Sequence, residues 1–201
     1  MAQTTLGVAL PEDTILLLHR YLWTPARYAH PCWLTSLGFK PKPDWSYGEN
    51  PQRDRCLNQA LRVRRGTPRL PLKLNDRQRR IAQLAPHMEP FALAMGLLML
   101  GCNDYFLLPD YRKAILRWLN EAVIRQLFGL CRGTRRAVFS PLSLKRMALD
   151  LGTAVLHRAA QAEPVLYAML ILSPPCERAL WPQVPTLAMN LLERSLCAEY
   201  R

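Results

Sequence analysis

The sequence has few of the patterns that build β-sheets. Runs in which Val, Ile and Thr alternate with polar residues are missing, and 17 prolines stand against only nine glycines. Strands need such alternating runs, whereas frequent proline punctuates short helices. The sequence therefore predicts an all-α protein: a single compact multi-helix domain with a central buried helix and short helices that begin at proline.

The motifs of common enzymes and metal sites are also missing. The chain holds no GxGxxG, GxxxxGK[ST] or HExxH pattern, its six cysteines form no CxxC pair, and its four histidines lie far apart. Phosphate loops and zinc sites need those spacings. We therefore expect no catalytic residue, no metal and no cofactor. A helical enzyme whose site is assembled only by the fold stays open as an alternative.

Long hydrophobic runs are absent as well. No segment approaches the roughly 18 consecutive apolar residues of a membrane-spanning helix. The N-terminal segment has no basic region, and Glu12 and Asp13 precede its apolar run, unlike a secretory signal. We expect a cytoplasmic protein, in which the cysteines serve as buried small side chains or free thiols.

The longest apolar block spans Phe91–Leu130. Its first part, Phe91–Leu100, is apolar on all sides and predicts the buried central helix. Gly101, Asn103 and Asp104 interrupt it. The second part, Tyr111–Phe128, has apolar residues at helical spacing and predicts one amphipathic helix, capped by Asp110 and with Trp118 on its buried side.

The prolines divide the chain into an N-terminal short-helix segment (1–38), a proline-rich connector (39–51) and a main helical body (52–201), all within one domain (1–201). Helix-start signals include the capping-box spacing of Asn75 and Gln78 and the Ser140-Pro141 pair. Further helices are expected at Pro11–Leu22 with Leu16 inward, Gln52–Val63 with Cys56 inward, Leu142–Ala160, Pro164–Leu172 and, opened by Pro185, the C-terminus. Arg64–Lys73 is expected to be a loop.

Much of the net charge of +12 is local. Ten basic residues lie between Arg53 and Arg80, where only Asp54 and Asp76 oppose them. Such a region is either a solvated surface or a patch that binds an acidic partner, because arginine forks pair with carboxylates and phosphates. No aromatic residue interrupts the stretch, so we consider nucleic acid an unlikely partner, with contact to phosphates alone as the alternative.

Two more groups complete the candidate partner-binding residues. Polar residues flank the second apolar helix, and two aromatic residues lie in the connector, where they either pin it to the body or contact a partner. The candidates are Arg62, Arg64, Arg65, Arg69, Arg112, Arg117, Arg125, Trp45 and Tyr47.

Three regions resemble a known family. Tyr21–Leu34 contains a Pro–x–x–Tyr–x–His run, Leu93–Leu130 holds a leucine-rich helix followed by an amphipathic one, and a Trp–Pro segment leads into the leucine-rich Pro185–Leu196. Together they are similar to the K component of bacterial type III secretion systems. The resemblance implies a helical adaptor without enzymatic activity at the cytoplasmic face of the inner membrane. Its implied partners are the cytoplasmic domain of the inner-membrane ring protein and the pod protein of the sorting platform.

Overall fold

Proline and capping side chains set where the helices begin in the computed structural model, which describes residues 11–42, 45–131, 133, 135–176 and 186–199. Asn75 and Gln78 form the expected capping box, and the Ser140 hydroxyl accepts a hydrogen bond from the Ser143 amide. Proline stands in the first turn of α2 (Pro31–Ser36), α3 (Pro51–Arg65), α7 (Pro109–Ile115), α9 (Pro141–Ala160) and α10 (Pro164–Met169). Its fixed φ and missing N–H suit that position.

The other helices are α1 (Pro11–Trp23), α4 (Asp76–Gln83), α5 (Met88–Leu100), α6 (Asp104–Leu107), α8 (Glu121–Leu130) and α11 (Thr186–Glu199). Single 3-10 turns lie at Pro25–Arg27, Ala85–His87 and Leu170–Leu172. No strand occurs in the ranges given above, so the predicted all-α fold is confirmed. No helix within those ranges is long and apolar enough to cross a membrane.

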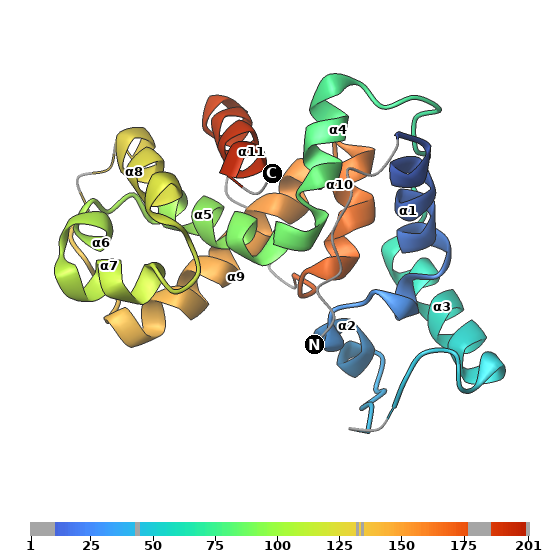
Figure 1. Cartoon of the computed structure of the whole chain (residues 1–201). Coiled ribbons are helices and arrows are strands. Elements are labelled where there is room, and N and C mark those ends of the chain that lie inside the picture. Colours follow the sequence, from blue (N-terminus) through green and yellow to red (C-terminus); the bar gives the residue numbers. More distant parts are fainter. Residues whose placement is uncertain (1–10, 43–44, 132, 134, 177–185, 200–201) are drawn as a thin grey trace, which may run out of the picture.

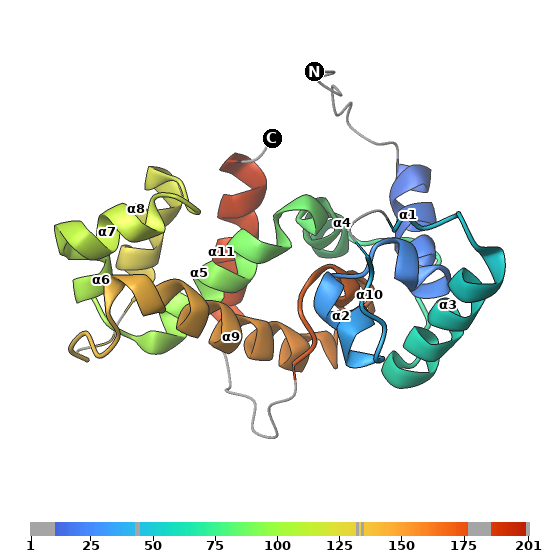
Figure 2. The same cartoon turned by 90° about the horizontal axis from the view of Figure 1, so that it is seen from below.

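Helices α5 and α9 pack along each other through the middle of the molecule (Figures 1 and 2). At one end of this pair lie α6, α7 and α8, which we call the distal lobe. At the other end lie α1, α2 and α3, which we call the N-terminal lobe, with α4 and α10 between it and the pair. Buried side chains from both lobes belong to one continuous core, in which α5 is the predicted central helix.

Glycines let α5 and α9 approach to backbone contact. A Cβ on Gly96 would lie 1.8 Å from the Ala148 carbonyl oxygen, and a Cβ on Gly152 would lie 1.7 Å from that of Ala92. Any larger residue at either glycine would force the helices apart. The crossing therefore fixes the two lobes on one rigid pair of helices.

The predicted single helix over Tyr111–Phe128 is wrong, because the chain forms α7, a turn and then α8. The helix begins at Pro109, not under a cap from Asp110, and ends at Ile115. The Asn120 side chain then accepts a hydrogen bond of 2.9 Å from the Val123 amide and begins a new helix. The turn rotates Trp118 out of the core and leaves it 43% exposed.

Several finer expectations also need correction. Leu16 and Cys56 are exposed, whereas Leu18 and Leu57, which were expected on the same apolar sides of α1 and α3, are buried. Helix α3 continues through Arg65 and ends at Gly66 (φ 80°), so the loop begins later than predicted. The predicted break after Leu100 is confirmed by left-handed Gly101, although α6 already begins at Asp104. Pro185 and the Trp181-Pro182 pair lie outside the described residues.

Candidate protein-interaction surfaces

A hollow of about 560 Å³ lies in the N-terminal lobe, between the end of α1, the connector and α3. Trp23 lines it and is 55% exposed, and the guanidinium carbon of Arg62 lies 5.4 Å from the centre of its ring. The carboxylate of Asp54 also lines the hollow although the residue is only 5% exposed. Its Oδ2 accepts a hydrogen bond of 2.7 Å from the Gly48 amide, and its Oδ1 lies 3.6 Å from Arg53 Nε.

The connector is pinned along α3 and forms one wall of this hollow. Tyr47 accepts a 2.9 Å hydrogen bond from Asn58 Nδ2, while Asn58 Oδ1 accepts one of 3.0 Å from the Ala26 amide. The Trp45 ring packs edge-on against Phe39 at 5.6 Å between centroids. Both residues therefore help to hold the connector in place, and Tyr47 also lines the hollow.

Arg65 is used inside the protein. Its Nη2 donates to the carbonyls of Tyr167 (2.8 Å) and Ala168 (3.3 Å), and its guanidinium lies over the rings of Trp33 and Tyr167. Burial lowers its pKa to about 10, because the charged form loses hydration. Nη1 also lies 3.4 Å from the Tyr21 carbonyl oxygen, so Arg65 joins α3 to α1 and α10.

The remaining arginines of this group stay near the surface. Arg64 is exposed and donates a 2.8 Å hydrogen bond to the Ser36 carbonyl, and Arg69 is exposed on the loop after α3. Arg62 is half-buried against Trp23, and its Nε has no hydrogen-bond acceptor within the described residues. The three side chains therefore do not form one patch with Arg65.

The distal lobe carries the second group of predicted residues. Arg112 donates to the Phe106 carbonyl at 3.1 Å and pairs with Glu121, so it ties α6, α7 and α8 together. Arg117 and Arg125 are exposed. Beside them, the exposed Trp118 ring has the Lys145 ammonium 3.0 Å from its centre, and the same ammonium pairs with Glu89 at 2.8 Å.

Sequence reasoning missed several residues of both surfaces. No sequence pattern singled out Trp23, and Asp54 appeared only as an opposing charge. Lys145 drew no attention because its partner Trp118 was assigned to the core. One signal was available for Asp54: it lies in the first turn of α3, four residues after the capping Asn50. Within the described part of the chain, no three His, Cys, Asp or Glu side chains come together as a metal site.

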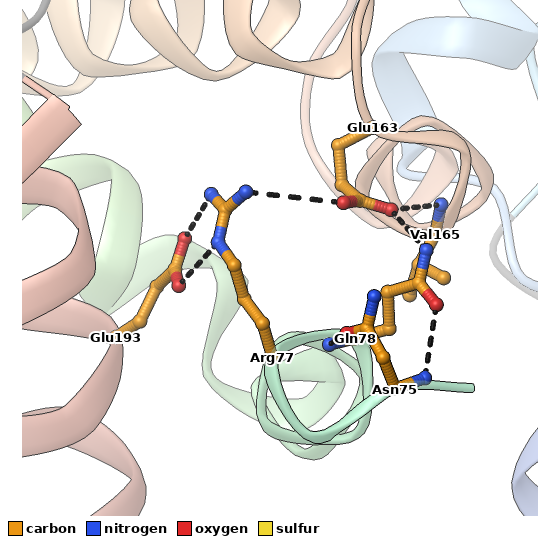
Figure 3. Close-up of polar contacts among 6 residues, drawn as sticks. All are labelled: Asn75, Arg77, Gln78, Glu163, Val165 and Glu193. Atoms are coloured by element: carbon orange, nitrogen blue, oxygen red, sulfur yellow. Dashed lines mark hydrogen bonds and ion pairs between the residues drawn. The ribbon is translucent and has the colours of Figure 1, made fainter.

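The C-terminal helix is attached by an ion pair that the sequence did not indicate (Figure 3). Arg77 of α4 donates from Nε and Nη2 to the two carboxylate oxygens of Glu193 at 3.2 and 3.0 Å. Its Nη1 lies 3.9 Å from Glu163, which also accepts a hydrogen bond from Gln78. Hydrogen bonding to Glu193 raises the pKa of Arg77. The contact holds α11 against α4, α5 and α8.

Exposed aromatic and basic groups therefore lie at both ends of the molecule, and such groups are frequent in surfaces that contact other proteins. Residues 16–175 match the family described as "Type III secretion system subunit". This is well over half of the chain, and the protein belongs to that family. Neither the curated proteins nor the solved structures contain a match.

Proposed function

We propose that the chain is a non-enzymatic cytoplasmic adaptor of a type III secretion sorting platform. It links the cytoplasmic domain of the inner-membrane ring protein to the platform's pod protein, and reaches the inner-membrane face through these partners. Membership of the secretion family and the helical fold support this role. Helical secretion subunits of this kind act through protein contacts, which agrees with the polar and aromatic groups described above.

The observation that carries the proposal is the separation of the two surfaces. The hollow with Trp23 and Arg62 lies in the N-terminal lobe, whereas Arg117, Arg125 and Trp118 lie in the distal lobe. Helices α5 and α9 separate the lobes, and their glycine crossing resists bending. An adaptor needs two binding surfaces that cannot block each other, and this arrangement supplies them.

Pull-downs with the ring protein's cytoplasmic domain and with the pod protein test the proposal. The full chain should bind both baits. Arg55→Glu/Arg62→Glu should weaken binding to one bait, and Arg117→Glu/Arg125→Glu should weaken binding to the other, while circular dichroism shows both variants folded. Binding to neither bait would reject the adaptor role, and equal loss of both baits in both variants would reject the two-surface arrangement.

A further inference from the structure

We infer that the hollow in the N-terminal lobe is a binding site for an acidic protein segment that carries an apolar side chain. The assignment rests on the proposed function for its biological setting, because it says what kind of partner segment one end of the adaptor takes. The groups that line the hollow define this ligand: a row of donors along α3 and an aromatic surface.

The donor row runs along α3. Arg55, Gln59 and Arg62 all line the hollow, and their i, i+4, i+7 spacing places them on one face of the helix. The rise of 1.5 Å per residue separates the backbones of Arg55 and Arg62 by about 10 Å, which is two turns. Arg55 is exposed and Arg62 is half-buried against Trp23. Both arginines line the hollow, and guanidinium forks bind carboxylates with two parallel bonds.

The hollow also has an aromatic and apolar part. Trp23, Tyr47 and Pro51 line it, and Trp23 keeps more than half of its surface exposed in a lobe whose other tryptophan on a helix, Trp33, is buried. Covering an exposed indole gives a large gain in buried apolar area, and tryptophan and arginine are the residues that most often dominate binding energy in interfaces. An apolar side chain lying between two acids of the segment would cover Trp23 while the acids meet the donor row.

The charge and donor pattern favours an acidic peptide over the alternatives. A basic segment would meet Arg55 and Arg62, whereas Asp54 already has Arg53 and the Gly48 amide beside it. The Asp54 carboxylate is covered by the protein itself, so it leaves the charge of Arg55 and Arg62 to face the ligand. A DNA backbone would bring phosphates to the arginines but no apolar side chain to cover Trp23.

Panning a random dodecapeptide library on the immobilised full chain tests the assignment. The bound pool is then passed over an immobilised Arg55→Glu/Arg62→Glu variant, which removes peptides that bind elsewhere on the chain. The peptides that remain are titrated by fluorescence anisotropy. We expect peptides with acids on both sides of an apolar residue. Their affinity should fall at least tenfold in the double variant and severalfold in Trp23→Ala, which removes an exposed side chain and should fold normally.

The matched control is Arg146→Glu/Arg194→Glu, which changes the net charge equally at two exposed residues that do not line the hollow. It should retain affinity within about twofold. Failure to enrich any acidic peptide, or equal loss in the control, would overturn the assignment. Tighter binding of a single-stranded oligonucleotide that is lost in the same double variant would make the hollow a phosphate site instead. The titration uses no secretion partner, so it can fail while the pull-downs succeed, and the reverse.

Discussion

Arg77 and Glu193 form a two-point ion pair that anchors the last helix to the body of the protein (Figure 3). Glu193 is only 1% exposed, whereas the Arg77 side chain keeps 38% of its surface. A carboxylate buried this deeply depends on its partner, because no water replaces a lost guanidinium. Residues 186–199 lie beyond the matched family segment, and this pair attaches the helix that they form to α4.

Arg77→Ala should destabilise the protein by about 3 kcal/mol, at the low end for a broken buried pair because Arg77 is partly solvated. Urea denaturation measures this change. Arg79→Ala is the matched control, since Arg79 pairs with Asp76 on the exposed surface of the same helix and should cost less than about 1 kcal/mol. Equal costs for the two variants would show that the Glu193 contact does not anchor α11.

Gly96→Ala should destabilise the fold by about 1–3 kcal/mol or more, because the new methyl group would meet the Ala148 backbone. Gly129→Ala is the control: Gly129 lies in α8 with nothing within 4 Å of a Cβ, so alanine should stabilise that helix by about 0.5–1 kcal/mol. Thermal melts of both variants show whether the melting temperature falls for Gly96→Ala and rises for Gly129→Ala. Stabilisation by Gly96→Ala would contradict the close crossing of α5 and α9.

Local signals predicted much of this fold. The proline starts, the capping box at Asn75 and the all-apolar α5 followed directly from residue chemistry. The turn between α7 and α8 could not be found in this way, because the apolar spacing continues through it and the choice is made by the Asn120 cap and the Arg112 bonds. Backbone contact at Gly96 depends on a helix more than 50 residues away in the chain, which periodicity does not reveal.

The exposed position of Trp118 makes a clear prediction. Trp118→Ala should cost less than about 1 kcal/mol, since it removes mainly the contact with Lys145. Trp33→Ala should cost about 3–5 kcal/mol, because Trp33 is buried and its Nε1 donates to the Ser173 carbonyl at 2.8 Å. Denaturation curves of the two variants decide between a surface and a core position. A large loss for Trp118→Ala would place it in the core after all.

Three histidines should make the fold less stable in mild acid. Burial lowers the pKa of His157, and the charge of Arg65 acts in the same direction; burial also lowers the pKa of His30 and His87. The unfolded chain therefore binds more protons below about pH 6.5, so stability falls as the pH drops through that region. His157→Gln should reduce the slope of unfolding free energy against pH below about pH 6.5. An unchanged slope would exclude His157 as a contributor.

The interaction surfaces were only partly predictable. Composition located the basic stretch around α3, and helical spacing suggested Arg117 and Arg125 on an outer face. Whether an arginine faces solvent or the interior depends on which carbonyl groups the fold brings near it. Arg65 faces the interior because it donates hydrogen bonds to the carbonyls of Tyr167 and Ala168, about a hundred residues away in the chain. The hollow joins Trp23 to Asp54 across the connector, so no short motif could indicate it.

The most direct test of the adaptor role is a bridging assay. The ring protein's cytoplasmic domain is immobilised, and the pod protein is passed over it with and without this chain. The account predicts that the pod protein is retained only when the chain is present, and that Arg55→Glu/Arg62→Glu abolishes retention while Arg69→Glu preserves it. Retention of the pod protein without the chain, or no retention with it, would contradict the account.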